Sequence, residues 1–357
     1  MGKTSHMSNY LITGGRGCIG SHVIDHLIEH LTSEDRIIIL DNDYNANIKN
    51  LSGAEKSGRE KNVKLEYIHG DIKDQSVLYN IFFYDRVDYV FHMASMLTLD
   101  TKYYRLRGIN NNTVGFCNIL EMCAMFNTKK LVFASSASVY GNPEITPTTE
   151  DVYFKNSKSL YAATKIANEY FANYYADDEG LKIVGLRPFN VYGPRQTNKN
   201  FYVQIIPKLI QKIRDNENVI GGQQTMDFIH ASDVGRFFVE AMNKEDVNRG
   251  NVIYKPDSLG GLYTVEKINF DGYINLGSGV STSVNELFFL IKKIMKDEFD
   301  IESTSKLVED KEFEDNYSHV KVRQSSTSLR KLLLGEPKIS LYQGLTETIQ
   351  SFLPAKN

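Results

Sequence analysis

The stretch "NYLITGGRGCIGSHVIDHLIEHL" at residues 9–31 joins a short apolar run to a glycine-rich turn and then to a helical pattern. From Val23 to Leu31 the apolar residues recur at the three- and four-residue spacing of an α-helix. A second apolar run, "RIIIL" at 36–40, follows and ends at Asp41. Strand, glycine turn, helix, strand and acid in this order predict the first unit of a dinucleotide-binding fold.

The glycine turn and Asp41 indicate which dinucleotide to expect. Gly14, Gly17 and Gly20 are spaced so that backbone can approach a diphosphate at the start of the helix, where free N–H groups point outward. Asp41 can accept hydrogen bonds from a ribose diol and would repel a 2′-phosphate, and no Lys or Arg follows it before Lys49. We therefore expect NAD rather than NADP; the alternative is an acid that merely ends a strand.

Further strands and helices continue the alternation. "VKLEYIHGD", "DYVFHMAS" and "KLVFASSASVYG" are typical of strands, and "NNNTVGFCNILEMCAMF" of a helix. The pattern predicts an α/β fold: a Rossmann-type doubly wound parallel sheet with ligands at its carboxyl edge and a smaller C-terminal α/β substrate lobe. We expect residues 8–188 to form the dinucleotide-binding domain, with 225–245 rejoining it, and 189–357 to form mainly the substrate lobe. The lobe should include a helix that opens with a Ser283–Glu286 capping box.

Composition limits the function classes. The 357 residues include 41 Lys and Arg against 44 Asp and Glu, without a basic stripe, so nucleic acid is not an expected partner. No apolar run is long enough for a membrane span. The opening residues are polar and lack the apolar core that a signal peptide needs, and we expect residues 1–7 to be an expression tag. Three cysteines are too few for a disulfide framework and indicate a reducing, cytoplasmic setting. His22, His26 and His30 are four residues apart, but we expect a solvated helix face and no metal site.

Residues 159–180, "SLYAATKIANEYFANYYADDEG", carry the candidate chemistry. Their apolar positions recur at helical spacing, so Tyr161 and Lys165 lie on one face of a helix. The alternative is that Tyr161 and Lys165 are simply two neighbouring surface residues without a catalytic role.

The motifs together, from "TGGRGCIGSH", "HGDI" and "FHMAS" through "FASSASVYG" and "SLYAATKIANEY" to "LRPFNVYGPRQ" and "MDFIHASDV", resemble a known family. They are similar, over nearly the whole chain, to the extended short-chain dehydrogenase/reductases, the NAD-dependent nucleotide-sugar epimerase/dehydratase family. The resemblance implies bound NAD, a nucleotide-diphosphate sugar as substrate and a role in polysaccharide biosynthesis. It also implies a homodimer, because the helices at 103–126 and 158–179 pair across a two-fold axis in a four-helix bundle.

The resemblance assigns roles to individual residues. Tyr161 would be the base that takes the proton of the sugar hydroxyl, and Lys165 would stabilise the phenolate and hold the nicotinamide ribose. Ser136 would bond the reacting oxygen, with Ser135 as the neighbouring candidate, and Asn112 would steady the backbone of the site. The implied cofactor contacts are Gly14, Gly17, Cys18, Ile19, Gly20, Asp41, Asn42, Asp71, Ile72, Met93, Ala94, Ser95, Asn112, Tyr161, Lys165 and Phe189. The implied substrate contacts are Ser136, Asn190 and Arg195.

The two residues directly after the implied catalytic serine narrow the reaction. Family members that eliminate water or CO₂ usually carry a Glu two positions after that serine, whereas this chain has Ala137 and Ser138. We therefore expect epimerisation at C4 through a transient 4-keto sugar. A net dehydrogenase or reductase, a dehydratase and a non-catalytic NAD-binding regulator remain alternatives.

Two departures from the family pattern mean that the sequence does not identify the sugar or the nucleotide of the substrate. Met226 stands where an Arg commonly grips the substrate diphosphate, and Arg195 and Arg323 are the candidate replacements. The segment 245–273 is longer than is usual for the family, and its role is open.

Overall fold

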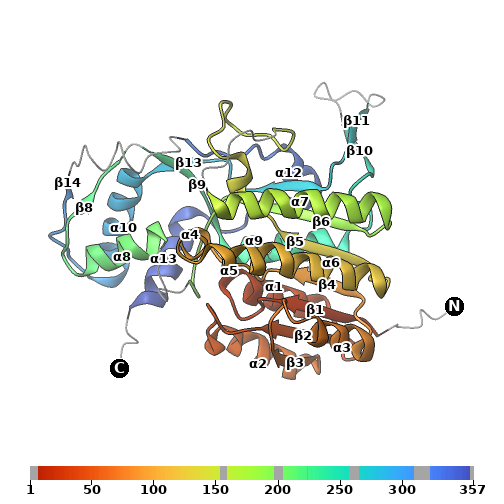
Figure 1. The fold of residues 1–357 in the computed structure, drawn as a ribbon. Coiled ribbons are helices and arrows are strands. Elements are labelled where there is room, and N and C mark those ends of the chain that lie inside the picture. Colours follow the sequence, from red (N-terminus) through yellow and green to blue (C-terminus); the bar gives the residue numbers. More distant parts are fainter. Residues whose placement is uncertain are drawn as a thin grey trace.

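The computed structural model describes residues 7–152, 159–196, 204–222, 224–256, 265–308 and 322–353. It confirms the predicted doubly wound α/β fold, with a central sheet of seven parallel strands in the order β12-β6-β5-β4-β1-β2-β3 (Figure 1). The strands are β1 (Asn9–Thr13), β2 (Arg36–Asp41), β3 (Lys64–His69), β4 (Tyr89–His92), β5 (Lys130–Ala134), β6 (Ile183–Pro188) and β12 (Tyr273–Leu276). Residues 1–6 of the supposed tag and 257–264 of the long segment lie outside the described residues.

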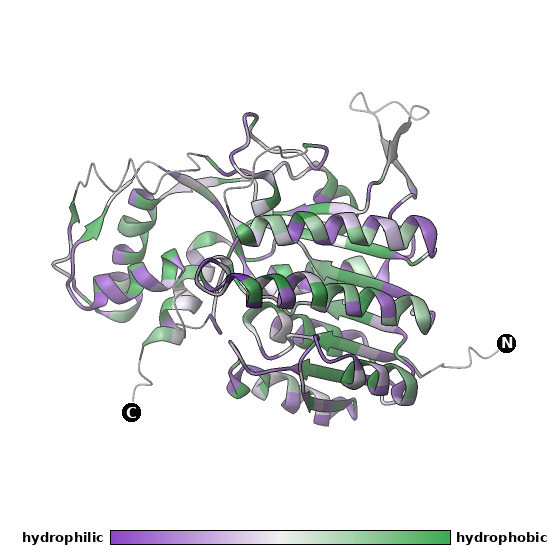
Figure 2. Cartoon of the chain, viewed as in Figure 1, coloured by the Kyte–Doolittle hydropathy of each residue, from purple (hydrophilic) through white to green (hydrophobic). Residues whose placement is uncertain are grey.

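Helices cover both faces of the sheet. On one face α1 (Cys18–His30), α2 (Ser52–Lys61), α9 (Ala231–Asn243) and α12 (Ser328–Leu334) enclose one apolar core. On the other face α3 (Gln75–Asp85), α6 (Gly115–Met125) and α7 (Leu160–Asp178) enclose a second core. Strands covered on both sides become near-continuous apolar runs, which is why the central strands are mostly hydrophobic in Figure 2.

The helical stretch predicted at 103–126 is divided in the structure. It consists of the end of α4 (Thr98–Tyr103), α5 (Arg105–Ile109), a π-helical turn at Asn110–Val114 and α6. Tyr104 interrupts the first two pieces with φ −117° and ψ 66°. This division brings α4 and α5 to the carboxyl edge of the sheet, where ligands are expected.

The smaller lobe lies beside that edge (Figure 1). Its helices α8 (Ile205–Arg214), α10 (Val284–Phe299) and α13 (Leu341–Phe352) share a third apolar core. Its strands form a three-stranded sheet of β13 (Ser281–Ser283), β9 (Thr225–His230) and β7 (Asn190–Tyr192), and a pair of β8 (Val219–Ile220) and β14 (Leu307–Val308). The predicted capping box is confirmed at the start of α10, where the side chains of Ser283 and Glu286 each bond the other's backbone N–H.

The chain crosses between the two parts several times. β9 lies in the three-stranded sheet, whereas α9, which follows it directly, packs against α1. β12 extends the central sheet beside β6, and an antiparallel hairpin of β10 (Val252–Pro256) and β11 (Val265–Asn269) projects from the sheet side of the molecule (Figure 1). Segments far apart in sequence therefore build the boundary between sheet and lobe.

We expected the histidines of α1 to lie on a solvated helix face, and this prediction is wrong for His22. That side chain is 7% exposed because α9, from far along the chain, covers it. Burial lowers the pKa of His22 to about 3, so its ring is neutral. His26 contacts Ser232 Oγ of α9 through Nε2 at 2.9 Å, and only His30 is exposed. Within the described ranges, His, Cys, Asp and Glu form no cluster that could hold a metal, and no helix is both long and apolar enough to cross a bilayer.

Candidate active site

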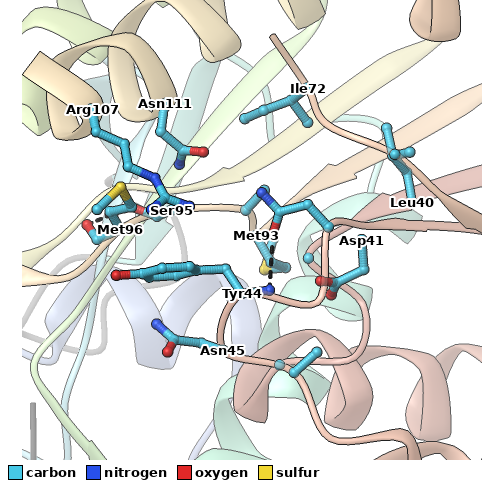
Figure 3. A pocket seen from close by; sticks show the side chains of 16 residues that line it. Leu40, Asp41, Tyr44, Asn45, Ile72, Met93, Ser95, Met96, Arg107 and Asn111 are labelled. Carbon is cyan, nitrogen blue, oxygen red and sulfur yellow. Dashed lines mark hydrogen bonds between the residues drawn. The ribbon is translucent and has the colours of Figure 1, made fainter. Parts of the chain in front are cut away.

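Two adjoining cavities open at the carboxyl edge of the central sheet. The glycine-turn groove, of about 100 Å³, runs over the turn after β1 and the ends of β2 and β4 (Figure 3). The Tyr161 cavity, of about 310 Å³, lies between the sheet and the smaller lobe. Met93 and Ser95 line both, so a ligand in the groove can reach into the cavity.

The glycine turn brings backbone close to the groove. Gly14 has φ +70°, and a Cβ there would lie 2.7 Å from the backbone nitrogen of Ala94. A Cβ on Gly20 would collide with the carbonyl oxygen of Gly14, so α1 can begin directly under the turn only because this residue is glycine. Free N–H groups at the start of α1 and the open turn fit a diphosphate.

Asp41 is held rigidly at the end of β2. Its carboxylate accepts hydrogen bonds from the backbone N–H of Arg16 at 3.0 Å and of Asp43 at 2.9 Å. Burial raises the pKa of Asp41, and these two bonds oppose that rise. The guanidinium of Arg16 pairs with Asp43 at 2.7 Å, so it does not neutralise Asp41 at contact distance. A fixed carboxylate with remaining lone pairs suits the diol of an adenosine ribose.

The structure divides the predicted cofactor residues into three sets. Those lining the glycine-turn groove are Gly14, Gly17, Asp41, Asn42, Ile72, Met93, Ala94 and Ser95. Those lining the Tyr161 cavity include Ile19, Tyr161, Lys165 and Phe189, along with Met93 and Ser95. Those that line neither are Cys18, Gly20, Asp71 and Asn112.

The residues of the third set support the site from behind. Asn112 accepts a hydrogen bond from Met96 N at 2.7 Å and donates one to Met96 O at 2.9 Å, so it fixes the backbone after β4. Asp71 accepts a hydrogen bond from Asn42 at 3.1 Å, and the thiol of Cys18 faces the carbonyl of Pro194 at 3.6 Å. Sequence reasoning placed Asn112 in this supporting role.

Sequence reasoning missed part of the groove. The residues that line it without having been predicted include Tyr44, Asn45, Ala46, Met96, Arg107 and Asn111. Their signal was partly available, because "YNA" at 44–46 begins three residues after Asp41, where β2 ends. Arg107 and Asn111 had no such signal, since their place depends on how α5 and the π turn fold back over the sheet.

Tyr161 and Lys165 both lie in the first turns of α7 and line the Tyr161 cavity. Lys165 is 2% exposed, and its Nζ donates a hydrogen bond to the carbonyl of Ala134 at 2.7 Å. The same Nζ lies 5.6 Å from the centroid of the Tyr161 ring. Burial lowers the pKa of Lys165 to about 8, and the negative charge of Glu169 opposes this. The lysine is therefore a charge placed near the phenol in a site with little water to screen it.

The structure distinguishes the two candidate serines. Ser135 is 3% exposed, and its hydroxyl donates to Glu169 Oε1 at 2.5 Å. Both serines line the Tyr161 cavity, but the hydroxyl of Ser136 accepts the backbone N–H of Ser138 at 3.1 Å, as the N-cap of a 3₁₀ turn at Ala137–Tyr140. An accepted bond leaves the hydroxyl proton of Ser136 for a ligand, which favours Ser136 as the reacting serine.

A buried ion pair holds α7 against the sheet. Arg187 of β6 donates to Glu169 of α7 through Nε at 2.9 Å and through Nη2 at 2.7 Å. Its Nη1 donates to the hydroxyl of Tyr140 at 2.7 Å, and that hydroxyl donates to Asn275 of β12 at 2.6 Å. The network fixes α7, and with it Tyr161 and Lys165, relative to two strands, β6 and β12, and to the serine loop.

The lobe supplies the far wall of the Tyr161 cavity. Asn190, Met226 and Arg323 line it, and the side chain of Asn190 donates to the carbonyl of Asp227 at 3.2 Å. Arg195 instead forms an ion pair with Asp25 of α1 at 2.7 Å and is not among the lining residues. Of the two candidate replacements for the missing arginine, Arg323 is the one on the cavity.

Comparisons with known proteins agree with this geometry. The model of the NAD dependent epimerase/dehydratase family matches residues 10–255. A putative UDP-glucose 4-epimerase of Methanocaldococcus jannaschii is 33% identical over 288 residues, which are 79% of this chain and 81% of that protein. A UDP-N-acetyl-alpha-D-glucosaminuronate decarboxylase of Bacillus cytotoxicus is 29% identical over 97% of this chain and 98% of its own. The crystal structure of UDP-glucose 4-epimerase with UDP-glucose from Thermotoga maritima has a TM-score of 0.76 at 28% identity and covers 96% of this chain and 98% of that one.

The first prediction concerns the cost of burying Lys165. A folded-state pKa of about 8, against 10.5, means that the native state binds fewer protons than the unfolded state between these pH values. The wild type should therefore gain stability as pH rises from about 8 to 10.5, by roughly 3 kcal/mol in full. Lys165→Met should be more stable than wild type at pH 7, and its advantage should shrink over that window. Urea unfolding without added nucleotide measures this; an advantage that stays constant with pH would contradict it.

The second prediction separates the two serines. Ser136→Ala should lower kcat by about a hundredfold or more, because a proton donor to the reacting oxygen is lost, while the free energy of unfolding changes little. Ser135→Ala should do the reverse: it leaves the largely buried carboxylate of Glu169 short of a donor and should cost about 1–3 kcal/mol of stability, with a smaller loss of kcat. Steady-state kinetics and denaturant unfolding on both variants give the answer, and the opposite assignment of the two losses would refute it.

Proposed function

Since the chain belongs to the NAD-dependent epimerase/dehydratase family, we propose that it epimerises C4 of a nucleotide-diphosphate sugar. One observation carries the choice of reaction: the described residues that line the Tyr161 cavity include Ser136, Tyr161 and Lys165 but no carboxylate. Elimination of water or CO₂ from a 4-keto sugar requires further acid–base chemistry. Ser138, in the position where the family's eliminating members usually carry a Glu, is a hydroxyl on the cavity wall.

The residues divide the proposed reaction among them. Bound NAD supplies the acceptor, and later the donor, of the C4 hydride. Tyr161 takes the proton of the C4 hydroxyl, and the nearby ammonium of Lys165 stabilises the phenolate that this requires. Ser136 donates a hydrogen bond to the same oxygen while it becomes a carbonyl. The phenol of Tyr161 returns the proton once the sugar presents its other face.

Two alternatives use the same residues. A net dehydrogenase would release the oxidised sugar, and Ser136, Tyr161 and Lys165 could perform that half-reaction equally well. A dehydratase or decarboxylase has precedent among the relatives, one of which is named a decarboxylase and matches nearly the full chain. The carboxylate-free lining of the described cavity favours the epimerase over the eliminating enzymes, and measurement of the product separates it from the dehydrogenase.

Arg323 is the proposed contact for the substrate diphosphate. It lines the same cavity as Met226, the residue that replaces the family's usual arginine, and its backbone N–H bonds the carbonyl of Thr225 at 3.0 Å. Position 226 and Arg323 are therefore neighbours across two chain segments, and a guanidinium from the second segment can supply the charge that the first lacks. Asn190 would bind the nucleotide-diphosphate from the adjoining strand.

The protein is proposed to act as a homodimer through α4–α7. Several large apolar side chains on these helices are exposed: Tyr103, Tyr104, Leu106, Val114, Tyr170, Phe171 and Tyr174. α6 and α7 pack side by side, and hydrophobic segments appear along both (Figures 1 and 2). A second copy related by a two-fold axis would cover this apolar face and form a four-helix bundle.

A cytoplasmic location is part of the proposal. Cys18, Cys117 and Cys123 are all free thiols, and Cys123 is buried in the core. Unpaired cysteines and a nicotinamide cofactor suit a reducing compartment.

The reaction is tested with UDP-hexoses, their N-acetyl forms and the corresponding uronates. We expect inversion at C4 without accumulation of NADH, because the hydride returns before the keto sugar leaves. Product stereochemistry and absorbance at the NADH band would be followed together. Stoichiometric NADH with a released keto sugar would establish the net dehydrogenase instead, and loss of water or CO₂ would establish an eliminating enzyme.

The role of Arg323 is tested by matched substitutions. Arg323→Met should raise KM about tenfold or more, since it removes a charge-assisted contact with the diphosphate, and should change kcat less. Arg195→Met is made in parallel to compare the two candidate arginines, and its KM should rise less than that of Arg323→Met. A larger rise for Arg195→Met would assign the diphosphate to Arg195.

The dimer is tested by light scattering at micromolar concentration. The wild type should have twice the mass of one chain, and Tyr170→Asp should shift the population towards the monomer because it places a charge in the apolar face. Tyr84→Asp on α3 is the control, since Tyr84 is 75% exposed and lies outside the proposed bundle. A monomeric wild type, or equal effects of both variants, would disprove this interface.

A further inference from the structure

Arg107 is the one cation among the described residues that line the glycine-turn groove. It comes from α5, and its guanidinium carbon lies 4.5 Å from the centroid of the Tyr44 ring, which comes from the loop after β2. Figure 3 shows the two side chains approaching from opposite sides of the groove. The hydroxyl of Tyr44 also donates a long bond, of 3.4 Å, to buried Asp100 of α4. Loop and helices thus meet across the groove.

The guanidinium of Arg107 has no ion-pair partner within the described part of the chain. The other arginine beside this region, Arg16, is neutralised by Asp43 and lies over the ring of Tyr67. Arg107 is therefore a charge that faces a binding groove and that the protein itself does not compensate by a salt bridge. Such an arrangement is suited to an anionic part of the ligand.

The position of Arg107 within the groove indicates which anionic part of the ligand it contacts. Asp41, Asn42 and Ile72 mark the adenosine end, and Met93 and Ser95, shared with the Tyr161 cavity, mark the nicotinamide end. In Figure 3 Arg107 stands with Ser95, Met96 and Tyr44, away from Leu40, Asp41 and Ile72. A dinucleotide that spans both ends has its diphosphate between them. A 2′-phosphate would instead lie beside Asp41, which would repel it.

We infer that Arg107 binds the diphosphate of NAD from the α5 side of the groove, with Tyr44 holding its guanidinium plane in place. The glycine turn provides backbone N–H donors to the diphosphate, and Arg107 adds a positive charge from a different element. The contact slows cofactor release, because NAD can leave only after the guanidinium has separated from the diphosphate. The inference rests on the family's NAD cofactor and not on the proposed reaction, and its test reads binding rather than turnover.

The test is the rate of NAD exchange on the purified protein. Wild type, Arg107→Met, Arg107→Lys and Arg105→Met would be loaded with isotopically labelled NAD and chased with unlabelled NAD. We expect about tenfold to a hundredfold faster loss of label from Arg107→Met, as for removal of one charge-assisted bond. Arg107→Lys should fall between Arg107→Met and wild type. Arg105→Met, on the same helix but outside the groove lining, should match the wild type. Unchanged exchange in Arg107→Met would overturn the inference.

Competition binding with fragments of NAD identifies which part of the cofactor Arg107 contacts. Arg107→Met should lose affinity for NAD and ADP-ribose by similar factors and keep its affinity for adenosine, which has no phosphate. Equal losses for adenosine would show that Arg107 only supports Tyr44 or the adenosine end, and would overturn the assignment. A selective loss for NADP, in a wild type that binds NADP as well as NAD, would move the contact to the 2′-phosphate and would also overturn it. Thermal unfolding of each variant checks that the fold is intact.

Discussion

Burial of the Lys165 ammonium is the constraint on which the rest of the site depends. A charge that is 2% exposed is costly unless neighbouring groups stabilise it, and here the carbonyl of Ala134 accepts its hydrogen bond while Glu169 opposes the loss of its proton. Arg187 in turn donates hydrogen bonds to Glu169. Lys165, Glu169 and Arg187 therefore form a connected group of charges that links α7 to β6. The arrangement costs stability and provides a cation close to a phenol that must ionise.

The local units of the fold could be predicted from sequence because their determinants are close together in the chain. The glycine turn with Asp41, the helix that carries Tyr161 and Lys165, and the cap of α10 each depend on residues within one or two elements. The position of β12 beside β6 could not be predicted, because nothing local in "YINL" states which sheet it joins. His22 was misplaced for the same reason: only the fold shows that α9 covers it.

The walls of the Tyr161 cavity likewise depend on tertiary contacts that the local sequence does not predict. Asp227, which is fully buried, accepts hydrogen bonds from the backbone N–H groups of Ser278, Gly279 and Ser325, and so gathers two distant segments around the start of β9. This gathering places Met226 and Arg323 on one cavity, although 97 positions separate them in the chain numbering. The sequence identifies Arg195 and Arg323 as the candidate replacements for the missing arginine, but only the tertiary contacts place Arg323 on the cavity and Arg195 against Asp25.

The most direct test of the account is the fate of the hydrogen at C4. A nucleotide-diphosphate sugar that carries deuterium at C4 would be converted by the wild type, and the product would be examined by mass spectrometry and NMR. If Tyr161 moves only the hydroxyl proton and the hydride returns within the closed cavity, the epimer should keep its deuterium at C4. Loss of the deuterium to solvent or to released reduced cofactor would contradict the account.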